Sequence, residues 1–152
     1  MYATRVPPHI LFSINGKLFS LSIKGKLIDG DLEMYLRTIK KHKIETLFIK
    51  LLIPEIFTMS YLLETIRKIT RSFPGLEPGA ITCLAPIKDF CKNIYHIDTK
   101  DVNFVFELLP KLEKQGLVEC SFHLNMEKYL LRGNNFFLKT YSMNDVNENI
   151  YA

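Results

Sequence analysis

The chain has 152 residues, of which 47% are hydrophobic and 24% charged, and its formal net charge is +4. This length and composition suit one globular domain that buries its own core, and they exclude a disordered chain. The basic residues are scattered along the sequence, whereas nucleic-acid-binding proteins gather them in a stripe. We therefore expect no nucleic-acid partner.

The sequence shows no targeting or membrane segment. Its first residues, MYATRVPPHILFSING, lack a basic region followed by an unbroken apolar run, so we do not expect them to be a signal peptide. The most apolar window, TLFIKLLIPEIF, is too short and too interrupted to span a bilayer. Cys83, Cys91 and Cys120 are an odd number without CxxC spacing, which favours reduced thiols. We expect a cytoplasmic protein.

The first third of the chain predicts a β-hairpin followed by a helix. Two β-rich runs, residues 10–14 and 18–23, meet at Asn15-Gly16, a dipeptide that suits a tight hairpin turn. The second run alternates apolar and polar residues, so we expect one wet face and an edge position in the sheet. Asp31 can cap the helix. The inward positions of this helix are Leu32, Tyr35, Leu36 and Ile39.

The middle of the chain predicts a buried strand and a second helix. Thr46–Leu51 is apolar on both faces except for Lys50, which is typical of a central strand. The helix follows the break at Pro54, and we expect one apolar stripe of it to face the core. The stripe consists of Ile56, Met59, Leu63, Ile66 and Phe73.

The next segment predicts shorter elements. Residues 80–84 and 95–97 are expected to be short buried strands, with a helix opened by Pro86 between them. Thr99 is expected to cap a further helix, and Pro110 lies inside its pattern, so we expect a kink or two abutting helices.

The last segment has a weaker pattern. Residues 117–124 predict one more strand, which extends the sheet or covers an edge. Residues 142–152 are expected to be frayed.

The alternation of strands and helices predicts the α/β class. We expect a single mixed β-sheet with helices packed against it. Residues 1–117 would form this domain, and residues 118–152 a C-terminal extension whose end is disordered.

The order of these elements resembles the STAS domain, the family of the bacterial anti-sigma-factor antagonists and of sulfate-transporter tails. Residues 23–29 (IKGKLID) are similar to the family's strand ending in Gly-Glu-Leu-Asp. Residues 46–63 resemble its apolar strand, Asp-Ser-Ser-Gly-Leu loop and helix. Residues 84–90 resemble its later Ser-Pro helix start. The likeness covers residues 10–116, and it implies a STAS-like fold and a protein partner.

The phosphorylated loop of that family is altered in this chain. Its Asp-Ser-Ser-Gly motif falls on Phe57, Thr58, Met59 and Ser60, so the acid and the phosphoacceptor serine are both replaced. A shift of one residue would place Thr58 or Ser60 at the phosphoacceptor position, and both are candidate phosphorylation sites. The alternative is a plain helix N-cap role for either residue.

The resemblance implies a non-enzymatic module of the anti-sigma-factor-antagonist type, regulated by phosphorylation where Thr58 or Ser60 is modified. Its partners would be anti-sigma or switch kinases and related signalling proteins. Lys26 and Lys50 would steer the partner. We expect the partner-binding residues at the second helix start, with exposed Tyr61 and Leu62. They are Thr58, Met59, Ser60, Tyr61 and Leu62.

The alternative function is a small ligand-binding or enzymatic α/β domain, with a pocket outside the carboxyl ends of the strands. The sequence contains no GxxxxGK[ST], GxGxxG, GxSxG or HExxH motif, so we predict no catalytic residues and no cofactor. The four histidines fall in separate segments, and we predict no metal site.

Overall fold

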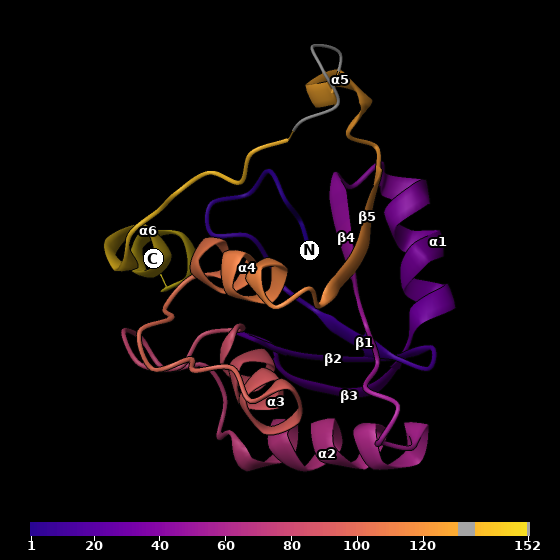
Figure 1. Cartoon of the computed structure of the whole chain (residues 1–152). Helices are drawn as coiled ribbons and strands as arrows, with labels where there is room; N and C mark the ends of the chain where they lie inside the picture. Colours follow the sequence, from indigo (N-terminus) through magenta and orange to yellow (C-terminus); the bar gives the residue numbers. More distant parts are fainter. Residues whose placement is uncertain (131–135, 152) are drawn as a thin grey trace.

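A computed structural model of the chain describes residues 1–130 and 136–151. Figure 1 shows a three-stranded sheet across the middle, with α2 and α3 beneath it and a two-stranded ribbon rising above it. The elements are β1 (Phe12–Ile14), β2 (Lys17–Ser22), β3 (Gly25–Asp31), α1 (Leu32–His42), β4 (Thr46–Leu51), α2 (Met59–Ser72), α3 (Ala85–Tyr95), α4 (Val105–Lys114), β5 (Val118–Leu124), α5 (Glu127–Leu130) and α6 (Met143–Tyr151).

The predicted α/β class is confirmed, but the predicted single mixed sheet is wrong. The described strands form two antiparallel sheets, β1-β2-β3 and β4-β5. One edge of β4 is paired with β5, and the other is bridged to the N-terminal segment through Tyr2 and Thr46. Because both edges of β4 are occupied there, β4 does not join the hairpin sheet.

The hairpin forms as predicted, but β2 is not an edge strand. Asn15 and Gly16 have φ values of 48° and 74°, as a tight two-residue hairpin turn requires. β2 pairs with β1 on one side and with β3 on the other. Ser20, expected on a wet face, is therefore buried along with Phe19.

The helix starts at Asp31 and Pro86 are confirmed. The Asp31 carboxylate accepts a hydrogen bond from the Met34 N–H at 3.0 Å and caps α1. Pro86 lies in the first turn of α3, where its missing N–H costs nothing.

α2 is rotated about its axis relative to the prediction. Its buried positions are Leu62, Ile66, Ile69 and Thr70. Ile56, expected in the core stripe, is 83% exposed and Met59 is 37% exposed. The reason is that α2 begins at Met59, so Ile56 lies before the helix and does not share its periodicity.

Three expectations for the second half are also wrong. Residues 80–84 contain turns and a single isolated bridge, from Ile81 to Glu77, instead of a strand. Residue 95 ends α3 instead of opening a strand. α4 begins at Val105 rather than near Thr99. α4 includes Pro110 as one helix, so of the two alternatives given for Pro110 the pair of abutting helices is wrong and the kink stays a prediction.

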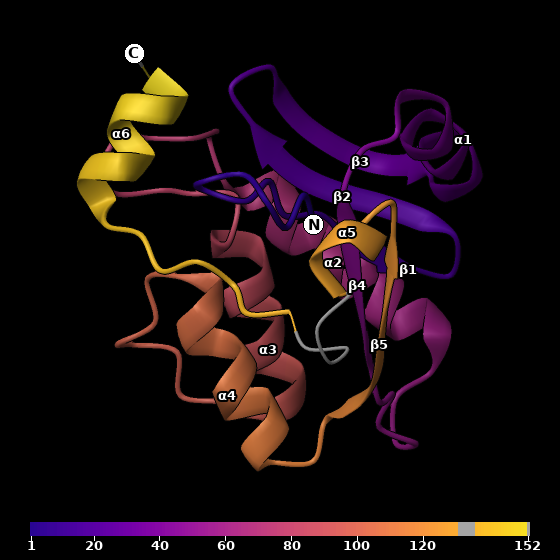
Figure 2. The ribbon, with the colours of Figure 1, turned by 90° about the horizontal axis from the view of Figure 1, so that it is seen from above.

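The predicted strand at residues 117–124 is present as β5, but it pairs with β4 rather than with the hairpin sheet. β5 belongs to the segment assigned to the C-terminal extension, and its ladder with β4 ties that segment to residues 1–117. Residues 143–151, expected to be frayed, form α6. Figure 2 shows α6 beyond α4, on the side of the molecule away from α1.

Two apolar clusters meet at α3. The first lies between the three-stranded sheet and helices α2 and α3. It contains Phe19, Leu62, Ile66, Ile69, Phe90 and Ile94. The second lies between α3, α4 and the segment before β1, and it contains Ile10, Ile87, Cys91 and Leu108 among others. Phe12 and Tyr95 pack against both clusters, so the two form one continuous interior.

Candidate protein-interaction surface

The segment between β4 and α2 is anchored where it leaves the strand. The Leu52 N–H donates to the Leu117 carbonyl at 2.9 Å, and the Tyr95 hydroxyl donates to the Leu52 carbonyl at 2.9 Å. A turn follows at Pro54, whose carbonyl oxygen accepts a hydrogen bond from the Phe57 N–H at 3.1 Å. The backbone of this loop is therefore held in place, and its side chains are presented in a defined arrangement.

Thr58 caps α2. Its backbone is extended (φ −73°, ψ 153°), and its hydroxyl oxygen accepts a hydrogen bond from the Tyr61 N–H at 3.2 Å. The N-cap role predicted for Thr58 or Ser60 therefore belongs to Thr58. The first turn contains no acidic residue, so the positive end of the helix dipole has no charged neighbour on its own helix.

Five large apolar side chains are exposed around this helix start. Their exposed fractions are 43% for Leu52, 52% for Ile53, 83% for Ile56, 37% for Met59 and 53% for Tyr61. We call these five residues the 52–61 surface. Tyr61 is stacked on Phe57, with ring centroids 5.1 Å apart and nearly parallel rings. Phe57 in turn packs against the apolar cluster between the three-stranded sheet and α2, so this surface is in contact with the core.

The structure brings four of the five predicted partner-binding residues to this surface. Thr58, Met59, Ser60 and Tyr61 are exposed. Leu62 is not, because it is only 2% exposed and packs beneath the three-stranded sheet, so its predicted exposure is wrong.

Sequence reasoning missed the two exposed isoleucines of the site, Ile53 and Ile56. Both precede the helix, and Ile56 was assigned to a helical stripe. Thr58 could have been recognised in the sequence as the N-cap of the helix. Residues before an N-cap lie outside the helical repeat, so Ile53 and Ile56 would not have been expected on its buried face.

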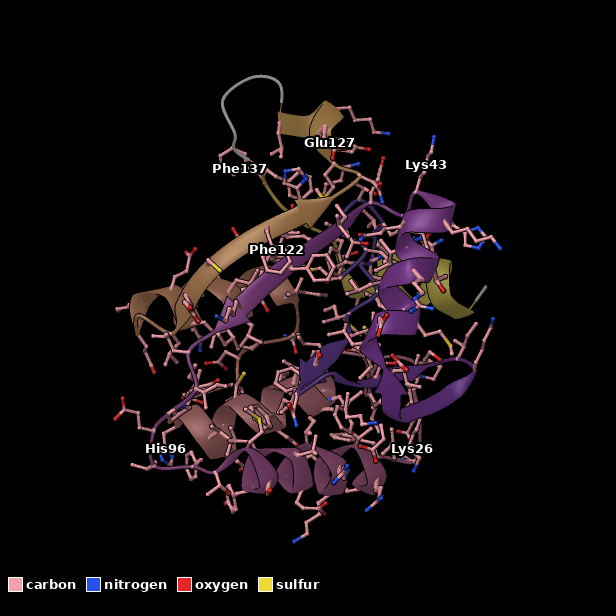
Figure 3. The ribbon with its side chains drawn as sticks, turned by 90° about the vertical axis from the view of Figure 1, so that its right-hand side faces the viewer. Lys26, Lys43, His96, Phe122, Glu127 and Phe137 are labelled. Atoms are coloured by element: carbon pink, nitrogen blue, oxygen red, sulfur yellow. The ribbon has the colours of Figure 1, made fainter. Side chains whose placement is uncertain are left out.

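The two lysines expected to steer a partner do not act together. The Lys26 ammonium donates to the carbonyls of Arg71 and Phe73, at the other end of α2. Figure 3 shows Lys26 at this end of the helix and His96 beyond the opposite one. Lys50 is exposed and paired with Glu119 at 2.9 Å, which raises the pKa of Lys50. Steering by Lys26 at the helix start is therefore wrong.

A cavity of about 390 Å³ lies elsewhere, where β2 ends. Residues 21–23 line it together with Arg5, His9, Cys83 and Asn149. It is therefore formed by segments far apart in the sequence, and it is separate from the 52–61 surface. The alternative prediction was a pocket at the carboxyl ends of the strands. This cavity lies at the carboxyl end of β2 and agrees with that prediction in position.

The buried cysteines do not provide a nucleophile. Burial raises the pKa of the Cys83 thiol, and it raises the pKa of the Cys91 thiol to about 12. Both are therefore protonated near neutral pH, and a protonated thiol is a poor nucleophile. In residues 1–130 and 136–151, no group of three or more His, Cys, Asp or Glu side chains is placed to hold a metal ion.

Comparisons with known proteins give no relative for this chain: no family model, curated protein or solved structure matches it. Within the described residues, no helix has the length and apolar character to cross a membrane.

Proposed function

We propose that this chain is a non-enzymatic protein-interaction module of the anti-sigma-factor-antagonist type, and that the 52–61 surface is its partner site. One observation carries the proposal. Five large apolar side chains are exposed within ten residues, at a position where the backbone is hydrogen-bonded and the helix is capped. Exposed large apolar side chains gathered in this way are typical of interaction sites on folded proteins.

The energetic reason is the cost of leaving these side chains in water. Complete burial of a large apolar side chain is worth about 1.5–3 kcal/mol. Ile56 is 83% exposed and Ile53 is 52% exposed, so most of this free energy for Ile56 and about half of it for Ile53 is not used in folding. A partner that covers both residues would recover it. The partner is therefore a protein with a complementary apolar surface, and the resemblance to the STAS family suggests a switch kinase or a related signalling protein.

Phosphorylation would act on the same surface. Ser60 is exposed in the first turn of α2, and no hydrogen bond of its hydroxyl is present among the described residues. The Thr58 hydroxyl already accepts the capping hydrogen bond. Ser60 is therefore the preferred acceptor of the two. A phosphate here would add about two negative charges beside an apolar contact, where the helix dipole tolerates them but a closely packed partner does not.

Affinity capture of the full chain with mass spectrometry tests this proposal, because it reports both the bound protein and any phosphate on Thr58 or Ser60. The captured protein is then titrated calorimetrically with wild type, Ser60→Asp and Lys68→Asp. Ser60→Asp places a carboxylate in the partner site, and we expect it to weaken association by about 1–3 kcal/mol. Lys68 is exposed on the same helix and serves as the matched control. Equal affinities for the three proteins would rule out the site.

A further inference from the structure

The cavity at the end of β2 has mostly apolar walls. It is open to solvent on one side and is lined by the N-terminal loop, the end of β2, the turn region before α3, and α6. Its volume of about 390 Å³ falls within the range of small-molecule sites, roughly 300–1,000 Å³. The apolar wall consists of Val6, Pro7, Pro8, Leu21, Ile23 and Leu76. Such a wall suits the apolar body of a ligand rather than a bare inorganic ion.

The cavity lining contains a positive charge, that of Arg5, and no negative charge. Arg5 lines the cavity, while no Asp or Glu does. Among the ion pairs of residues 1–130 and 136–151, none includes Arg5. Its guanidinium lies over the Tyr2 ring, 5.3 Å from the centroid, and this contact restricts the motion of the side chain. Arginine in this situation is suited to a carboxylate, which its planar fork binds through two parallel hydrogen bonds.

His9 adds a neutral polar group. Its ring packs against Tyr2, with ring centroids 5.6 Å apart. Burial lowers the pKa of His9 below its usual range, and nearby positive charges, including that of Arg5, lower it further. The imidazole is therefore neutral near pH 7 and carries one N–H donor. Ser22 and Asn149 line the same cavity. The Ser22 hydroxyl already donates to the Gly25 carbonyl and accepts from the Lys24 N–H. Asn149 donates one amide N–H to the Asp145 carbonyl, so its second N–H can donate to a ligand.

We propose that this cavity binds a small organic acid with an apolar body, whose carboxylate pairs with Arg5 while its body lies against the apolar wall. The cavity volume of about 390 Å³ suits a small ligand such as a short fatty acid or a single-ring aromatic acid. This site is separate from the 52–61 surface and does not depend on the function proposed for that surface.

Amide chemical shifts of the full ¹⁵N-labelled chain test the proposal, with octanoate and octan-1-ol as probes. The two probes have the same chain and differ in charge. We expect octanoate to shift the amides of Ser22, Ile23, Leu76 and Asn149, and octan-1-ol to shift the same amides with weaker binding. Arg5→Gln is expected to weaken octanoate binding at least about 10-fold and to leave octan-1-ol binding unchanged, because only the charge-assisted pair is removed. Arg5→Lys should retain most of the octanoate affinity.

Arg37→Gln is the matched control, because Arg37 is exposed on α1 and paired with Glu33. It should bind octanoate as wild type does. Unchanged octan-1-ol binding by Arg5→Gln also shows that this variant keeps the cavity. The proposal is overturned if octanoate shifts none of these amides, if it shifts the amides of residues 52–61 instead, or if wild type and Arg5→Gln bind it equally.

Discussion

At its C-terminal end α2 is fastened to β3, whereas at its N-terminal end it is surrounded by side chains that face water. The Arg67 guanidinium pairs with the Asp29 carboxylate at 2.8 Å, and the Lys26 ammonium donates to the Phe73 carbonyl at 2.9 Å. At the other end, Thr58 caps the helix, and Ile56, two residues before the cap, is 83% exposed. The middle and last turns of α2 contact the sheet, whereas Met59 and Tyr61 in its first turn are exposed.

The largest expected effect comes from a matched pair of isoleucines in this region. Ile66 is fully buried under the three-stranded sheet, and Ile56 is 83% exposed. We expect Ile66→Ala to lower the free energy of unfolding by about 2–5 kcal/mol, the usual loss for a buried isoleucine. Ile56→Ala should change it by less than about 0.5 kcal/mol. Equilibrium urea titrations measure both values, and equal losses would mean that the two ends do not differ.

The helix cap gives the next largest effect. Thr58→Ala removes the acceptor of the Tyr61 N–H, and we expect a loss of about 1 kcal/mol in the free energy of unfolding. Ser60→Ala is the control, and it should be neutral within about 0.5 kcal/mol. A larger loss for Ser60→Ala than for Thr58→Ala would assign the cap to Ser60 and leave the Thr58 hydroxyl free instead.

The hydrogen bonds from Lys26 to the C-terminal end of α2 can be removed while the apolar part of its side chain is kept. Lys26→Met removes the ammonium that donates to the carbonyls of Arg71 and Phe73. We expect a loss of about 0.3–1 kcal/mol in the same urea titration, as for other cations at helix C-termini. Lys24→Met, in the exposed turn between β2 and β3, should have no measurable effect. Equal results for the two variants would contradict the fastening.

The smallest effect is a pH dependence at the same end. The hydrogen bond from Arg67 lowers the pKa of Asp29 below its usual range. Because the folded state binds fewer protons here, this carboxylate stabilises the fold above its unfolded-state pKa of about 3.9, and the contribution is lost as pH falls through the lower folded-state pKa. Asp29→Asn should therefore be slightly less stable than wild type at pH 7, and the difference should shrink below about pH 4. Thermal unfolding at several pH values measures it, and a difference that grows on acidification would contradict the pair.

Local signals allowed several elements to be predicted from the sequence. Asn15-Gly16 adopts positive φ values with little strain, and Asp31 supplies a carboxylate to a free N–H of α1. These features depend on residues within one turn of each other, so they can be recognised without the rest of the fold. The cap of α2 depends on a local hydrogen bond too, and Thr58 was one of the two residues predicted to make it.

The division into two sheets could not be predicted in this way. It depends on the pairing of β4 with β5, about 70 residues later, and on the bridge between Tyr2 and Thr46. The cavity has the same character, because Arg5, Ser22 and Asn149 meet there from distant parts of the chain. The rotation of α2 was missed because Ile56 was counted in a helix that begins three residues later.

The central claim is that the 52–61 surface binds a partner. Calorimetric titration of the captured protein with the Ile53→Ser/Ile56→Ser double variant tests it most directly. The control is Met34→Ser, since Met34 is 67% exposed on α1, away from this surface. The account predicts at least about a 10-fold loss of affinity for the double variant, from the apolar burial it removes, and less than a twofold change for the control. A double variant that binds as tightly as wild type, or a wild-type chain that captures no protein, would contradict it.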